Sequence, residues 1–163
     1  MLISENIQPA LFEAFFRPVI RVRFNWDRFV HEQWPVDLIA FDRSDGFSKF
    51  RLPWYVSAEG QEVQYNNPDA KSFLHLSEIP ASLKSLSQSH QESIEEYRQT
   101  YEIGIKPIQF AVGVYKIPGD EFLILDGCHR MAAISILDCD FVVLGFNVNG
   151  PVDEDVVPDL IHA

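Results

Sequence analysis

The pattern of hydrophobic and polar residues is clearest in the last third of the chain. Two apolar runs, residues 108–116 and 121–125, flank a Pro-Gly turn sequence, and this pattern predicts two strands joined by a hairpin. Residues 128–137 are apolar on most sides and follow a glycine, so they predict a short buried helix. Residues 140–148 then predict another strand.

The first half of the chain has weaker periodicity. The segment 19–26, VIRVRFNW, alternates apolar residues with polar ones, which is typical of a half-buried strand. Arg21 and Arg23 would then share its solvated face. Residues 11–16 predict one or two helical turns that end before a proline, and residues 41–65 contain turn signals that predict short strands.

The sequence Asn66-Asn67-Pro68-Asp69 is the best candidate for a boundary, since such residues favour turns and linkers. It separates an aromatic-rich, strand-containing N-terminal lobe, residues 1–68, from a C-terminal core, residues 69–163. One compact domain is the alternative. The spacing of polar and apolar residues predicts a helix over roughly 81–100 with one solvent-exposed face. The order of elements predicts an α+β fold.

Composition is that of a folded chain with a sizeable core. Of 163 residues, 47% are hydrophobic and 23% are charged, which excludes wholesale disorder. The 13 phenylalanines, together with Trp26, Trp34 and Trp54, predict an aromatic core, with an exposed recognition patch as the alternative.

A formal net charge of −11 restricts the classes of partner. It argues against non-specific binding to nucleic acid, which depends on lysine and arginine, and against an anionic membrane surface. It is compatible with a basic protein partner, and solubility alone explains it equally well.

Several features of the sequence predict a cytoplasmic protein. The N-terminus lacks a basic region and is interrupted by Glu5, Pro9 and Glu13, so it is a poor signal peptide. No apolar run approaches the roughly 18 residues of a membrane span. With only 2 cysteines, a disulfide framework is not expected.

The sequence Asp126-Gly127-Cys128-His129-Arg130 carries the candidate chemistry. The first N–H groups of a helix are unpaired and favour an anion, and Gly127 permits close approach of a ligand. Arg130 has a planar fork suited to phosphate or carboxylate, and His129 can donate a hydrogen bond or carry a proton. Asp126 could cap the helix, orient Arg130, or help to hold a metal ion on a phosphate.

Cys128 has two interpretations. A thiol at a helix N-terminus beside cationic groups tends toward the nucleophilic thiolate, but cysteine is also commonly a small buried apolar residue. Cys128, His129 and Cys139 lack zinc spacing, so no structural metal site is expected. The remaining histidines are isolated in the sequence and are expected at the surface or in packing contacts; they are His31, His75, His90 and His162.

Residues 106–138 resemble the core of the ParB/sulfiredoxin superfamily. A Pro-Ile pair opens a strand, a hairpin follows, and a Gly-x-His-Arg turn starts a helix. Sulfiredoxin carries Gly-Cys-His-Arg, as residues 127–130 do, and the ParB-like and free-serine-kinase branches add the aspartate that corresponds to Asp126. The first 75 residues resemble no part of sulfiredoxin, and its Gly-Gly before the cysteine is Asp-Gly here.

The resemblance implies a C-terminal core with a mixed sheet and packed helices. It implies that Gly127, His129 and Arg130 hold nucleotide phosphates and that Lys106 lies beside the nucleotide pocket. Cys128 would correspond to the thiol that attacks an activated sulfinic acid. Glu78 is the nearest candidate for the catalytic acid of the serine kinases.

Three functions follow as hypotheses. The first is a protein that binds a nucleotide or small phosphorylated ligand, with ATP and Mg²⁺ as cofactors and with ATP-dependent phosphotransfer, ATP hydrolysis or a sulfiredoxin-like reduction as its reaction. The second is a catalytically inactive acidic binding protein, such as an immunity protein that neutralises a basic nuclease toxin. The third, DNA binding as in ParB, is opposed by the net charge of −11.

Overall fold

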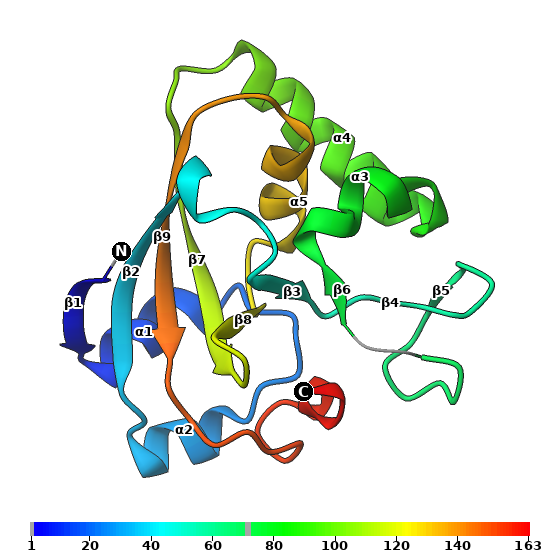
Figure 1. Ribbon diagram of the computed structural model, residues 1–163. Helices are drawn as coiled ribbons and strands as arrows, with labels where there is room; N and C mark the ends of the chain where they lie inside the picture. The colour runs from blue at the N-terminus through cyan, green and yellow to red at the C-terminus, as the bar shows by residue number, and fades with distance from the viewer. Residues whose placement is uncertain (1, 71–72) are drawn as a thin grey trace.

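The centre of the molecule is a mixed seven-stranded sheet with strand order β1-β2-β9-β7-β8-β3-β6 (Figure 1). The computed structural model describes residues 2–70 and 73–163. The strands of the sheet are β1 (Leu2–Ile7), β2 (Val36–Asp42), β3 (Phe50–Leu52), β6 (Leu74–His75), β7 (Ile108–Ile117), β8 (Glu121–Ile124) and β9 (Phe141–Val148). β7 runs parallel to β9 and antiparallel to β8, and β3 runs parallel to β8.

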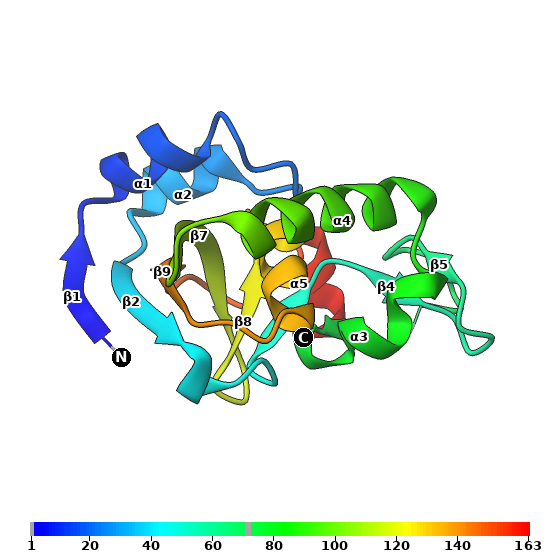
Figure 2. The ribbon, with the colours of Figure 1, turned by 90° about the horizontal axis from the view of Figure 1, so that it is seen from above.

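Five helices and a small hairpin complete the described part of the chain. The helices are α1 (Pro9–Phe16), α2 (Trp26–Glu32), α3 (Ile79–Ser82), α4 (Gln88–Ile103) and α5 (Cys128–Ile136). The hairpin pairs β4 (Tyr55–Val56) with β5 (Glu62–Val63). Figure 2 shows α4 running beside α5, with α1 and α2 grouped together. None of the described helices is both long and apolar enough to cross a membrane. The predicted α+β class is confirmed.

Two hydrophobic clusters lie on opposite faces of the sheet. Val112 and Val114 of β7 belong to the cluster that α3, α4 and α5 cover. Tyr115 and Ile117 of the same strand belong to the cluster that α1, α2 and the C-terminal segment cover. Because neighbouring residues of a strand point to opposite faces, each face has its own core. Trp34 and Trp54 are buried, which confirms the prediction that the aromatic residues are chiefly core.

The predicted elements of the last third are confirmed to within a residue or two. The expected boundary at residues 66–69, however, does not divide the sheet, because strands on both sides of it in the sequence belong to the same sheet. β2 and β3 precede it in the sequence, and each is hydrogen-bonded to a strand that follows it, β9 and β8 respectively. Both parts of the chain therefore contribute strands to the same sheet.

The predicted strand over residues 19–26 is wrong. This segment has no regular structure before α2 begins at Trp26. Ile20 and Phe24 are buried in the second cluster, whereas Arg21 and Arg23 are exposed. The alternation therefore reflects side-chain burial along an extended segment that has no strand beside it to complete a ladder of hydrogen bonds.

The single helix predicted over roughly 81–100 is also corrected. The structure has α3, a short 3-10 turn and then α4, which starts only at Gln88. Leu86 is extended and buried in the core, and the side chain of Ser87 accepts a hydrogen bond from the N–H of His90 at 3.4 Å. A serine cap stabilises a helix start at that point, so the helix is interrupted there.

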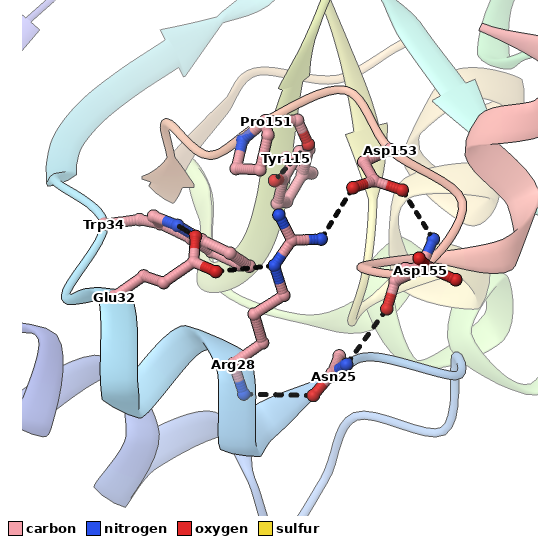
Figure 3. Close-up of polar contacts among 8 residues, drawn as sticks. All are labelled: Asn25, Arg28, Glu32, Trp34, Tyr115, Pro151, Asp153 and Asp155. Carbon is pink, nitrogen blue, oxygen red and sulfur yellow. Dashed lines mark hydrogen bonds and ion pairs between the residues drawn. The ribbon is translucent and has the colours of Figure 1, made fainter.

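Arg28 on α2 ties the N-terminal helices to the C-terminal segment (Figure 3). Its guanidinium donates to Glu32 and to Asp153, each at 2.6 Å. The adjacent Asn25 donates from its amide group to the carbonyl of Asp155 at 3.0 Å. These contacts help to fix the C-terminal segment, whose final turn, residues 158–162, contains Asp159 at the edge of a cavity.

Candidate functional site

The first turn of α5 is attached firmly to the middle of the sheet. The N–H groups of Leu125 and Asp126 both donate to the carbonyl of Gly113 on β7, at 2.8 and 3.2 Å. Gly127 follows with φ of +88° and starts the helix. A Cβ at this position would lie 2.6 Å from a methyl carbon of Val112. Gly127 is thus required both by the backbone conformation and by the packing of the helix on the sheet.

Asp126 and Arg130 form an ion pair one helical turn apart. The guanidinium donates to the carboxylate at 2.7 Å, and the two side chains are 18% and 26% exposed. Arg130 also lies 5.2 Å from the ring centre of Phe110, in a cation–π contact. No side chain of the described residues caps α5. The sequence offered three roles for Asp126: capping the helix, orienting Arg130 or helping to hold a metal ion. The structure shows the second, because Asp126 accepts a hydrogen bond from Arg130.

The environment of Cys128 favours the thiol form. Its Sγ lies 3.7 Å from the carbonyl oxygen of Ile124, and the side chain packs against the core. Burial raises the pKa of Cys128, and the negative charge of Asp126 raises it further, while Arg130 opposes the shift weakly. This direction is opposite to the thiolate that the sequence suggested.

His129 meets a histidine from another helix. Its Nε2 lies 2.7 Å from Nδ1 of His90 on α4, and Nε2 of His90 lies 3.2 Å from a carboxylate oxygen of Glu62 on β5. The indole ring of Trp54 lies against both imidazoles, with ring centres 4.2 and 5.2 Å apart. His90, which was expected at the surface or in packing contacts, packs against Trp54 and also contacts His129.

A cavity of about 370 Å³ opens in front of this turn. We call it the polar cavity. It is lined by four residues of the segment 19–23, by residues 53–55, 62–65 and 125–129, and by His90 and Asp159. Its wall therefore combines the first turn of α5 with segments from both halves of the sequence.

Two arginines on this wall have no ion-pair partner in the described part of the chain. Arg21 and Arg23 lie on the segment before α2, and neither is within ion-pair distance of a described carboxylate. All other arginines do form such pairs: Arg17, Arg28, Arg43, Arg51, Arg98 and Arg130. Arg23 instead lies 4.0 Å from the ring centre of Tyr65. Positive charge is thus left available at the polar cavity in a chain of net charge −11.

Asp159 also lines the polar cavity. It is only 5% exposed and accepts a hydrogen bond from the hydroxyl of Tyr55 at 2.7 Å. Burial raises the pKa of Asp159, although the hydrogen bond from Tyr55 partly opposes this shift. The sequence contained no signal for this residue, because its partner lies more than half the chain away.

A second, less polar cavity of about 700 Å³ adjoins the same turn. We call it the apolar cavity. Phe15, Phe16, Tyr97 and Phe146 contribute aromatic surface, and Arg130 contributes its positive charge. Residues 126–129 line both cavities. The first turn of α5 therefore separates a polar from an apolar recess.

The predicted site residues are thus brought together only in part. Asp126, Gly127, Cys128 and His129 line both cavities, and Arg130 lines the apolar one. Glu78 and Lys106 line neither. Glu78 is exposed and accepts a hydrogen bond from the N–H of His75 at 2.7 Å, and the exposed Lys106 donates to the carbonyl of Tyr101.

Sequence analysis overlooked Arg21, Arg23, Glu62, His90 and Asp159 as site residues. They lie on separate segments, and only the fold brings them to α5. Comparisons with protein-family models, with curated proteins and with solved structures each give no match to this chain. The site is therefore interpreted from its own chemistry.

Proposed function

We propose that this protein binds a nucleotide or small phosphorylated molecule in the polar cavity. The observation that carries this proposal is the pair of arginines, Arg21 and Arg23, that line the cavity without a described acidic partner. The uncapped N-terminus of α5 lies on the same wall. Unpaired N–H groups, the positive end of a helix and planar guanidinium groups are the features that bind phosphate oxygens.

The size of the cavity and its mixed charge support a small ligand rather than a polymer. The net charge is −11, which disfavours a long polyanion such as nucleic acid. Within the cavity, Glu62 and Asp159 can accept hydrogen bonds from hydroxyl or amino groups of a ligand. A phosphorylated metabolite or a nucleotide has both kinds of group.

The resemblance of residues 106–138 to the ParB/sulfiredoxin superfamily extends the proposal to ATP and to ATP-dependent phosphotransfer or hydrolysis. Phosphoryl transfer depends mainly on positioning and charge stabilisation, which the arginines and α5 can supply. A sulfiredoxin-like reduction is less well supported, since it needs a thiolate and the pKa of Cys128 is raised. Glu78 and Lys106 have no role in this proposal, because they lie outside both cavities.

A protein-bound Mg²⁺ does not fit the residues at the turn. Mg²⁺ prefers several oxygen ligands in octahedral geometry. The carboxylate of Asp126 is already bonded to Arg130, and the described residues contain no group of three or more potential metal-ligating side chains. The proposal therefore retains Mg²⁺ only as a counter-ion that accompanies nucleotide phosphates.

Calorimetric titration tests the proposal. ATP and inorganic pyrophosphate, each with and without Mg²⁺, are titrated into the wild type and into the double variant Arg21→Gln/Arg23→Gln. The matched control is Arg17→Gln/Arg43→Gln, which removes two exposed arginines that already form ion pairs. We expect binding to be weakened at least tenfold in the first variant only, since each lost charge-assisted contact is worth about 1.5–3 kcal/mol.

Equal affinity in all three proteins, or no heat with any probe, would refute the phosphate site. The alternative, an acidic protein that neutralises a basic toxin, would then become the leading hypothesis. It rests on the net charge of −11 and predicts binding to a basic protein partner with a strong dependence on salt.

A further inference from the structure

The contacts of Glu62, His90 and His129 determine which ring nitrogens carry protons. Nε2 of His90 lies at ion-pair distance, 3.2 Å, from Glu62, and because a carboxylate can only accept, this contact favours the tautomer with a hydrogen on Nε2. In neutral His90 the other nitrogen, Nδ1, is then an acceptor. The contact of 2.7 Å between Nδ1 of His90 and Nε2 of His129 therefore requires a hydrogen on Nε2 of His129.

This assignment leaves Nδ1 of neutral His129 without a hydrogen. No described residue forms a hydrogen bond with it, and His129 borders both cavities. A proton that enters at Nδ1 can be accommodated by a single shift, in which the hydrogen on Nε2 of His129 moves to Nδ1 of His90. The positive charge then rests on His90 beside Glu62, and no other bond forms or breaks.

The pair accepts one proton but resists a second. Two imidazolium rings with nitrogen atoms 2.7 Å apart would repel each other strongly. After the first proton, Nδ1 of His129 is a hydrogen-bond donor rather than an acceptor. The protonation state of the pair thus decides whether the turn of α5 repels or attracts an anion.

We propose that Glu62, His90 and His129 form a proton relay, in which the histidine pair takes up one proton when an anion binds at the first turn of α5. The identity of the anion rests on the proposed function, but the sharing of one proton by the pair does not. The relay links three elements, β5, α4 and α5, and Trp54 holds both rings in place.

No other described carboxylate takes the place of Glu62 beside the histidine pair. Burial lowers the pKa of His129, and the neighbouring His90 lowers it further, so neutral His129 is favoured before an anion arrives. The charged and titratable groups that share the cavities with it are Arg21, Arg23, Tyr55, Glu62, Tyr65, Tyr97, Asp126, Cys128, Arg130 and Asp159. Among the described carboxylates, only Glu62 is within ion-pair distance of His90.

The first arm of the test needs no ligand. Histidine ring chemical shifts are recorded by NMR between about pH 5 and pH 8 for the wild type, Glu62→Gln and the control His31→Gln, which alters an exposed histidine on α2. We expect His90 and His129 to share one titration step, which Glu62→Gln moves to lower pH by about one unit because the carboxylate no longer stabilises the cation. Independent titrations, or a midpoint unaffected by Glu62→Gln, would overturn the relay.

The second arm measures protons taken up on binding. Inorganic pyrophosphate is titrated by calorimetry in two buffers that differ in ionisation enthalpy, into the wild type and His90→Gln. At pH values above the step, the wild type should take up about one proton more than the variant, and the difference in affinity should grow about tenfold per pH unit as the pH falls towards the step and level off below it. Equal proton uptake would overturn the relay.

The two arms separate the relay from the proposed function. If pyrophosphate and ATP fail to bind while the shared titration is present, the histidine pair is confirmed and the phosphate ligand is wrong. If pyrophosphate binds without proton uptake, the phosphate site is retained and the relay is wrong. Thermal unfolding of each variant confirms that it is folded.

Discussion

Side chains of the same type differ sharply in their surroundings in this molecule, and the proposed binding residues are chosen on these differences. Arg51 forms two hydrogen bonds with Glu121, at 2.5 and 3.1 Å, whereas Arg21 and Arg23 line a cavity without a described acidic partner. An arginine in a two-bond ion pair has most of its donors occupied, whereas one without an acidic partner keeps donors for a ligand. Arg21 and Arg23, which the sequence predicted only to be solvated, are therefore the arginines that we assign to ligand binding.

The raised pKa of Cys128 has a direct consequence for its reactivity. At pH 8 we expect the thiol in Cys139→Ser, where Cys128 is the remaining cysteine, to react with iodoacetamide more than tenfold more slowly than free glutathione, because burial and Asp126 suppress the thiolate. Cys128→Ser, tested in parallel, gives the rate of Cys139. Rapid alkylation of Cys128 that is already maximal at neutral pH would contradict this assignment and revive the nucleophile.

Asp159 predicts a specific dependence of stability on pH. Burial raises its pKa, so between the usual pKa of an aspartate and the raised value the folded protein binds this proton more tightly than the unfolded chain. The free energy of unfolding is therefore greatest below this window and falls as pH rises through it. The variant Asp159→Asn lacks this loss, so it should become more stable relative to the wild type as pH increases from about 4 to 7.

Urea unfolding at several pH values measures this difference. Asp155→Asn, which alters an exposed aspartate of the same segment, is the matched control and should follow the wild type. A constant difference between Asp159→Asn and the wild type at every pH would show that Asp159 has an ordinary pKa.

At the scale of single elements, the sequence predicted best where one pattern determined one element. The apolar runs and turn residues after residue 108 specify β7, β8, α5 and β9 unambiguously, and all four form. The segment 19–26 alternates equally well, yet it lies over an aromatic cluster with no neighbouring strand. Alternation records burial, and only the tertiary structure supplies a pairing partner.

The same distinction explains which parts of the site could be predicted. Residues 126–130 are contiguous, so the sequence showed that they share a turn, and the structure confirms that this turn starts a helix. His90 contacts His129, and Glu62 contacts His90, from positions distant in the sequence. No local pattern encodes such contacts, because they depend on how β5 and α4 are placed relative to α5.

Gly127 should tolerate replacement less well than Gly119, another glycine with a positive φ. In Gly127→Ala, the alanine would have to adopt the positive φ of Gly127, and its methyl group would lie only 2.6 Å from a methyl carbon of Val112. We therefore expect a loss of about 3 kcal/mol in the free energy of unfolding. Gly119→Ala also has a positive φ but meets only ordinary contacts, and should cost about 1 kcal/mol. Urea unfolding of both variants compares them, and equal losses would show that packing against β7 is not decisive.

At the scale of the whole molecule, the sheet joins the two halves of the chain. β2 pairs with β9, and β3 pairs with β8, across the boundary expected at residues 66–69. Each hydrophobic cluster likewise contains residues from both halves. This interleaving places the segment 19–23 and the hairpin of β4 and β5 at the cavity in front of α5.

We therefore expect the chain to unfold as one cooperative unit. Tryptophan fluorescence reports on residues before 69, where Trp26, Trp34 and Trp54 all lie, and far-ultraviolet circular dichroism reports on helices in both halves. The two urea transitions should coincide, with midpoints equal within error. A fluorescence transition at clearly lower urea would instead indicate an N-terminal lobe that unfolds separately.

We propose that phosphate binds at the first turn of α5 between Arg21, Arg23 and His129. A series of ¹H–¹⁵N correlation spectra, recorded as ATP is added to labelled protein, locates the bound ligand. The largest shifts should fall on the amides of residues 128–130 and of residues 21–23. Spectra that do not change, or shifts confined to other surfaces, would contradict it.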